Sequence, residues 1–171
     1  EVLNEQDWIL AERTYAVWPD LEALMRVHDV PQFTLDSHRP VGEFDVFGLS
    51  FATELGYTNM LTEIDLAGIP IFAKDRREHD PIVMAGGHAA FNPEPIADFI
   101  DAAVLGDGEE IALTISQLIR EWKSAGRPGG GRNAASGPAP IRRSRRPGPG
   151  NAGPGTPWRS CAARPGFRIG R

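Results

Sequence analysis

Cysteine is nearly absent from this sequence, since Cys161 is the one such residue among 171. A single thiol excludes an internal disulfide and a metal cluster held by several cysteines of this chain. Long apolar runs are also lacking, because no stretch approaches the roughly 18 apolar residues of a membrane helix. No basic start followed by an apolar run resembles a signal peptide. We therefore expect a cytoplasmic protein with no membrane partner and no metal site of its own.

Acidic residues are missing from the last part of the chain, because all 23 lie at or before Glu121. Residues 1–125 carry eight Lys and Arg, so their net charge is 8 − 23 = −15. Residues 126–171 carry ten Arg and no acid, so their net charge is +10. The total length suits about one domain of roughly 100–200 residues. We predict one domain over residues 1–125 and a tail of different character over residues 126–171.

The tail contains eleven Gly, eight Pro and ten Arg and has no apolar period of 3.6 or 2. It lacks the apolar side chains of a core, so disorder is expected. Three interpretations stay open. An Arg-rich tail can neutralise nucleic-acid phosphates, although this one has neither Lys nor repeats, so nucleic acid is not the partner we favour. GC-rich DNA translated out of frame gives the same composition, and a plain linker is the third interpretation.

Short apolar segments alternate with helical patterns along residues 1–125. The strands that we expect cover residues 9–17, 32–35, 44–50, 81–85 and 102–105. The helices that we expect begin at Pro19, cover residues 55–67, begin after Asn92, and follow Gly108. Segment 44–50 is apolar enough for burial on both faces. This alternation predicts an α/β fold: a doubly wound, flavodoxin-like parallel sheet with helices on both faces.

Candidate ligand-binding residues follow the predicted strands, because ligands of doubly wound folds bind beyond the carboxyl ends of the strands. The residues at those ends are Ser50 and Phe51, Gly86, Gly87 and His88, and Gly106, Asp107 and Gly108. A glycine pair either forms a tight turn or lets a large ligand approach the backbone. Gly106 and Gly108 precede a helix and can present N–H groups to an anion. Two glutamates in the first turn of that helix argue against a nucleotide phosphate.

Three histidines are further candidates for contact with a cofactor. His38 ends an Asp-x-His sequence like that of cobalamin proteins, but the glycine that should follow comes one residue late, at Gly42. His79 lies in a charged loop and is most simply a solvated residue. His88 follows the glycine pair and is the histidine best placed to face a ligand. No Ser–His–Asp, His-Glu-x-x-His, Walker or Cys-x-x-Cys pattern is present, so we assign no catalytic residue.

The most specific motif is GGHAAFNPEPIADFIDAAVLGDGEE, over residues 86–110. It resembles the end of the cobalamin-binding-like domain that precedes the barrel of many radical-SAM enzymes. Residues 12–25 and 44–70 resemble one uncharacterised bacterial branch of these proteins. The resemblance is collinear over roughly residues 2–126.

The resemblance implies that one more strand and helix of the domain lie before Glu1. It implies that the domain is followed by a barrel whose Cys-x3-Cys-x2-Cys motif holds a four-iron cluster that cleaves S-adenosylmethionine. That barrel of the same polypeptide is the expected partner. Cobalamin is the expected cofactor here, with S-adenosylmethionine and the cluster confined to the intact parent protein. The cofactor contacts that the resemblance implies are Ser50, Gly86, Gly87, Gly106 and Gly108, beside the His88 suggested by its position.

Two other functions stay open at the level of the sequence. The domain could be a non-catalytic flavodoxin-like docking module that has lost the corrin site. Large apolar side chains filling the crevice at the strand ends would favour that function. The chain could also be an RNA-associated protein that acts through its Arg-rich tail, in which case its binding should depend strongly on salt.

Overall fold

A three-stranded parallel sheet lies at the centre of the computed structural model, which describes residues 2–106, 108–126, 137–138 and 167–168. The strands are β1 (Val46–Ser50), β2 (Ile82–Gly86) and β3 (Ala102–Ala103), side by side in chain order. β1 pairs with β2 along its whole length, from Val46 opposite Ile82 to Ser50 opposite Gly86. The parallel pairing that the alternating pattern predicted is confirmed.

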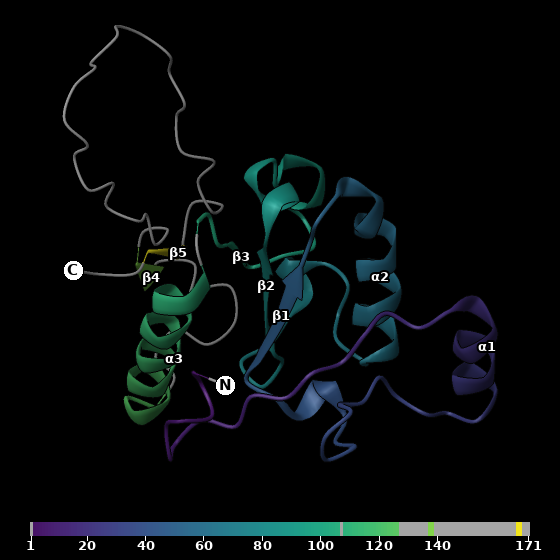
Figure 1. Cartoon of the computed structure of the whole chain (residues 1–171), viewed down its shortest axis with the longest axis horizontal. Helices are drawn as coiled ribbons and strands as arrows, with labels where there is room; N and C mark the ends of the chain where they lie inside the picture. The colour runs from purple at the N-terminus through teal and green to yellow at the C-terminus, as the bar shows by residue number, and fades with distance from the viewer. Residues whose placement is uncertain (1, 107, 127–136, 139–166, 169–171) are drawn as a thin grey trace, which may run out of the picture.

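Three α-helices accompany this sheet: α1 (Pro19–Val27), α2 (Tyr57–Leu66) and α3 (Gly108–Ser124). Short 3-10 turns cover Val41–Glu43, Glu54–Gly56, Ala73–Asp75, His88–Phe91 and Glu94–Ile96. α2 and α3 lie on opposite sides of the sheet (Figure 1). Because α2 joins two parallel strands, it runs back from the carboxyl ends of the strands to their amino ends. The doubly wound α/β fold expected from the sequence is therefore confirmed.

The main core lies between the sheet and α2. Phe47 and Leu49 of β1 are 5% and 7% exposed, and they belong to one buried cluster with Met60 and Ile64 of α2. Burying a side chain as large as Ile64, which is fully enclosed, stabilises the fold by roughly 1.5–3 kcal/mol. Of the alternate residues of β1, Gly48 and Ser50 are exposed and Val46 is half-buried. The prediction that β1 would be buried on both faces is therefore wrong, because β1 is an edge strand that packs only its α2 side.

A second set of interactions ties the loop before β2 to the end of the β2–β3 connection through Arg76, which is 7% exposed. Its guanidinium donates to the Asp101 carboxylate at 2.7 Å and to the Phe99 carbonyl at 2.5 Å. It also donates to the carbonyls of Pro70 and Ile71. Burial raises the pKa of Asp101, while Arg76 acts in the opposite direction. The ion pair between buried Arg76 and half-buried Asp101 connects the ends of the segments that lead into β2 and β3.

Two segments predicted as strands are not strands. Residues 9–17 lie beside residues 32–35, but side chains replace the regular ladder: Gln32 donates to the Tyr15 carbonyl at 3.0 Å. Residues 32–35 form only an isolated antiparallel bridge between Phe33 and Pro40. Pro40 has no N–H with which to extend a ladder, so the bridge does not continue into a strand pair.

Two predicted helical features also differ from the structure. The helix expected after Asn92 is only the 3-10 turn Glu94–Ile96, with prolines on either side of Glu94 that lack N–H groups. Ile96 and Ile100 of this segment are nevertheless buried. Leu55, the first residue of the second predicted helix, is 86% exposed. It lies in the 3-10 turn before α2, where the helical period does not yet apply.

The tail from residue 126 onward falls largely outside the described residues. Of it the structure gives Gly126 and two dipeptides, β4 (Gly137–Pro138) and β5 (Phe167–Arg168), which pair in parallel. The predicted disorder of the tail therefore stays a prediction. In the described part of the chain, every helix is too short or too polar to cross a membrane.

Candidate cofactor-binding surface

Toward the carboxyl ends of β1 and β2, small residues occupy one face of the sheet, beside the buried Met84 that pairs with Gly48. Ser50 pairs with Gly86, so both project from the sheet face opposite α2, together with Gly48 two residues earlier. Gly48 and Ser50 are exposed and Gly86 is half-buried. A Cβ atom on Gly48 would have no neighbour within 4 Å, and one on Gly86 would meet only the Val104 Cβ, at 4.0 Å. We call Gly48, Ser50 and Gly86 the strand-end shelf.

Gly87, the second glycine of the predicted pair, has a structural role in the turn. Its φ is +88°, a conformation that side chains disfavour. A Cβ atom there would lie 2.6 Å from the Phe51 carbonyl oxygen. Two backbone hydrogen bonds hold Phe51 against this turn. Phe51 N–H donates to the Gly86 carbonyl at 2.9 Å, and Ala89 N–H donates to the Phe51 carbonyl at 3.1 Å. The fold itself therefore requires glycine at position 87.

His88 opens the loop that follows, and its side chain is exposed beside the shelf. Tyr57, the first residue of α2, fixes this loop, because its hydroxyl lies 3.0 Å from the Ala89 carbonyl and 3.1 Å from the Asn92 carbonyl. Its ring packs edge-on against Phe51, with centroids 5.4 Å apart. Burial raises the pKa of Tyr57, so the hydroxyl stays a donor. No local sequence pattern indicates this role, because the carbonyls that Tyr57 contacts lie 32 and 35 residues further along the chain.

Gly106 and Gly108 lie beyond the end of β3, and both are exposed. Val104 N–H donates to the Ala85 carbonyl at 2.7 Å, which extends the pairing past the two-residue strand. Gly106 has a φ of +118°, and Gly108 opens α3 with no atom within 4 Å of its Cβ position. Asp107 lies outside the described residues. The contact between Gly86 and Val104 places the end of β3 beside the shelf.

The other two histidines lie elsewhere. His38, with a φ of +58°, sits in an exposed turn, where Ser37 Oγ donates to Glu12 at 2.7 Å. Hydrogen bonds from Thr34 and Ser37 lower the pKa of Glu12. The His79 side chain is 73% exposed and lies 3.6 Å from Asp80. Within the described ranges, no three His, Cys, Asp or Glu side chains are grouped so that they could hold a metal ion.

The arrangement suits binding and orientation of a large, flat molecule. It offers a level floor, the Ser50 hydroxyl, the exposed imidazole of His88 and the glycine backbone beyond β3. The predicted residues Ser50, Gly86 and His88 are thus neighbours in space, and Gly87 supports them from within the fold. Broad ligands bind at this edge of doubly wound sheets.

Comparison with known families gives one match. The family described as radical SAM proteins, N-terminal, matches residues 1–135, more than three quarters of the chain. No curated protein and no solved structure matches the chain.

Proposed function

This chain belongs to the family of N-terminal regions of radical-SAM proteins, and we propose that it holds a corrinoid cofactor for the catalytic domain of its parent protein. The observation that carries the proposal is the strand-end shelf, a glycine-floored surface at the ligand-binding edge of the fold. A corrin is a broad, flat ring, so it needs such a floor rather than a narrow cleft.

The residues present fit a corrin ring. Gly48 and Gly86 let the ring approach the backbone, because neither position carries a side chain. Ser50 would donate its hydroxyl to an amide on the rim of the ring, and His88 would face the ring from the adjoining loop. Gly106 and Gly108 would offer backbone N–H groups from the third strand end. When bound, the corrin supplies cobalt-centred chemistry, and the protein supplies its position.

The remaining chemistry of the parent lies outside these residues. Radical-SAM proteins use S-adenosylmethionine and a four-iron cluster, and such a cluster needs several thiolates. This chain has only Cys161, so its own residues do not fit the cluster. We assign the cluster and S-adenosylmethionine to a barrel domain of the parent polypeptide, which would be the partner of the shelf.

The competing function of a docking module is less well supported at this edge. A surface that docks protein needs large apolar side chains, whereas the shelf has two glycines and a serine. Phe51, the large residue closest in sequence, is turned inward and 5% exposed. The alternative of RNA binding rests on the Arg-rich tail and stays a sequence-based hypothesis.

A titration tests the proposal directly. The 171-residue chain is titrated with hydroxocobalamin and, separately, with cobinamide, which has the corrin ring but no nucleotide tail, and the visible absorbance is followed. We expect saturable binding of both compounds, with free dimethylbenzimidazole producing no competition. Binding of hydroxocobalamin alone, fully displaced by dimethylbenzimidazole, would assign recognition to the tail and contradict the role of the shelf. No binding of either compound would refute the proposal.

A further inference from the structure

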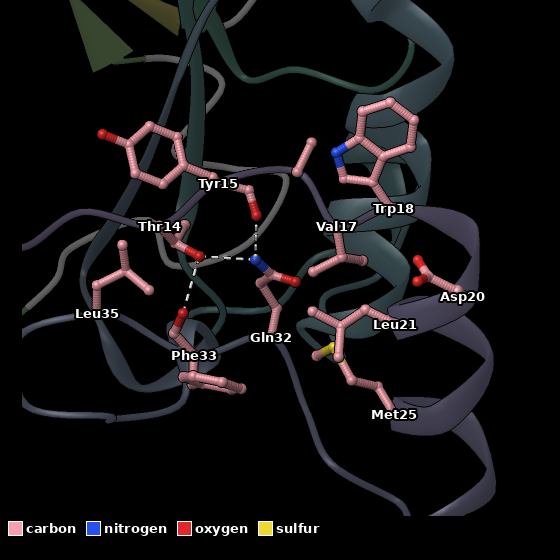
Figure 2. A pocket seen from close by; sticks show the side chains of 11 residues that line it. Thr14, Tyr15, Val17, Trp18, Asp20, Leu21, Met25, Gln32, Phe33 and Leu35 are labelled. Atoms are coloured by element: carbon pink, nitrogen blue, oxygen red, sulfur yellow. Dashed lines mark hydrogen bonds between the residues drawn. The ribbon is translucent and has the colours of Figure 1, made fainter.

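An apolar groove lies between the segment before α1, α1 itself and residues 32–35 (Figure 2). It has a volume of about 370 Å³. Its floor and walls include Val17, Trp18, Leu21, Met25 and Gln32. Gln32 N–H donates to the Leu66 carbonyl at the carboxyl end of α2. The groove is therefore at the opposite end of α2 from the strand-end shelf.

The neighbourhood of the groove exposes an unusual amount of apolar surface. Twelve large hydrophobic side chains are exposed in the described part of the chain, and seven of them lie between residues 15 and 35: Tyr15, Trp18, Leu21, Leu24, Val27, Val30 and Leu35. Trp18 is 79% exposed and Val27 is 76% exposed. In α1 only Met25 is buried. Concentrated apolar exposure of this kind is typical of interaction sites.

Gln32 gives the groove a buried hydrogen-bond acceptor without a partner. The residue is 2% exposed, and its Oε1 accepts no hydrogen bond from any described residue. Figure 2 shows this oxygen directed toward Val17 and Leu21. Leaving such a group unpaired costs about 1–3 kcal/mol. Leu21 is 45% exposed, so an incoming donor would reach the oxygen once Leu21 moved aside.

The orientation of the Gln32 amide is fixed by its surroundings. Its Nε2 donates to the Thr14 hydroxyl at 2.6 Å and to the Tyr15 carbonyl at 3.0 Å. The Thr14 proton is already used, because it is donated to the Phe33 carbonyl at 2.8 Å. If the amide were rotated by 180°, its oxygen would face two hydrogen-bond acceptors, the Thr14 hydroxyl oxygen and the Tyr15 carbonyl. The acceptor therefore points toward the groove, and only an N–H or O–H group can satisfy it.

The charge around the groove is net negative. Residues 14–35 carry three carboxylates and one arginine, and that arginine, Arg26, is held by Glu22 at 2.9 Å and Asp65 at 2.7 Å. Asp20 lines the groove and forms no ion pair with any residue that the structure describes. The whole of residues 1–125 has a net charge of −15. A cationic group is the complement of this surface.

We propose that the apolar groove docks a segment of a partner polypeptide in which apolar side chains are flanked by arginine or lysine. The apolar side chains cover Trp18, Leu21 and Leu24. A basic side chain pairs with Asp20, and an N–H group from the segment reaches Gln32 Oε1. The proposal does not depend on corrinoid binding, because the groove and the shelf lie at opposite ends of α2.

A pair of probe peptides tests this proposal. The ¹⁵N-labelled chain is titrated at 0.15 M salt, where weak surface attraction is screened, with acetylated LRALLRAL and with its acidic counterpart LEALLEAL. We expect the basic peptide to shift the Trp18 indole and Gln32 side-chain amide signals saturably, and the acidic peptide to leave them in place. Trp18→Phe identifies the indole signal. Equal shifts with both peptides, or none with either, would overturn the proposal.

Variants locate the site and separate it from self-association. Asp20→Asn should raise the dissociation constant of the basic peptide about fivefold, the size of a surface ion pair. Leu24→Ser should raise it by about tenfold. Leu55→Ser changes a leucine that is even more exposed, at 86% against 57% for Leu24, and that lies in the 3-10 turn before α2, so it should change nothing. If sedimentation instead finds a dimer that Leu24→Ser dissociates, the groove is an interface between copies of this chain, and the proposal of a basic partner fails.

Discussion

At several positions of this chain, contacts of a single atom determine which amino acids the fold accepts. The two adjacent glycines show this best, because the sequence could not tell a tight turn from a ligand contact. Gly87 serves the turn, since its Cβ position is filled by the Phe51 backbone, whereas Gly86 has room for a side chain. The difference depends on a contact between positions 36 residues apart, which no local pattern records. The turn accounts for the glycine at position 87, and contact of either glycine with a ligand stays a prediction.

Gly87→Ala should destabilise the fold. The new methyl group would stand 2.6 Å from the Phe51 oxygen, and alanine would also be held at positive φ, which costs roughly 1–3 kcal/mol. Thermal unfolding followed by circular dichroism measures the loss. Gly68→Ala is the matched control, because its φ is also positive but its Cβ position is open, so it should cost only the conformational part. Equal losses in the two variants would show that the contact with Phe51 is unimportant.

Arg76→Ala should be among the most damaging single changes. It leaves the half-buried Asp101 carboxylate without its cation and three carbonyls without a donor, a loss of about 3 kcal/mol, the lower end for a buried pair. Arg76→Lys should rescue little, because an ammonium cannot reach the same set of acceptors. Arg77→Ala changes an exposed neighbour and should alter the midpoint of urea unfolding very little. A lysine variant as stable as the original would contradict the guanidinium geometry.

At the scale of elements, apolar periodicity was a reliable guide where backbone pairing was regular. β1, β2 and α2 were predictable because each has a run of apolar residues typical of its type, and because glycines end β2 and precede α2. Residues 9–17 were not predictable, because a backbone carbonyl in this segment is bonded by a side chain far along the chain instead of by a neighbouring strand. Gln32 donates to the Tyr15 carbonyl in this way. The helix expected after Asn92 does not form for a local reason, which is that Pro95 follows only two residues after Pro93.

The loop that carries His88 should loosen when Tyr57 is replaced. Tyr57→Phe removes the hydroxyl that reaches the Ala89 and Asn92 carbonyls, at a cost of about 1 kcal/mol. Hydrogen exchange should quicken at residues 88–92 and stay unchanged in α1, which serves as the internal reference. Faster exchange throughout the chain would indicate global destabilisation instead of a loosened loop.

The stability of α2 should depend on pH through Glu63. Burial raises the pKa of Glu63 above its usual value of 4.5, so the folded state binds its proton more tightly than the unfolded state. Protonated Glu63 therefore stabilises the folded state fully at pH values below the usual pKa. This stabilisation is lost as the pH rises through the raised pKa of the folded state. Glu63→Gln should therefore increase the free energy of unfolding at pH 7 and leave it nearly unchanged at pH 3.

Glu94→Gln is the control for this effect, because Glu94 is exposed. It should leave the pH profile of unfolding as it is in the original chain. A Glu63→Gln variant that is less stable than the original at pH 7 would contradict the sign of the effect.

At the scale of the whole molecule, the fold separates two surfaces of opposite character. The strand-end shelf is flat and poor in side chains, and the apolar groove is rich in exposed hydrophobic residues and acidic in its surroundings. The place of the shelf followed from the sequence, because the topology of alternating strands and helices fixes where ligands bind. The groove did not, because it is formed by segments that were expected to be strands.

The measurement that tests the central claim most directly compares corrinoid binding by the original chain and by Gly86→Val. A Cβ atom at position 86 meets only the Val104 Cβ, at 4.0 Å, and the branched side chain of valine would stand on the shelf. We predict that the variant keeps its melting temperature within a few degrees and loses hydroxocobalamin binding at least tenfold by isothermal titration calorimetry. Undiminished binding by a folded variant would contradict the assignment of the shelf as the cofactor site.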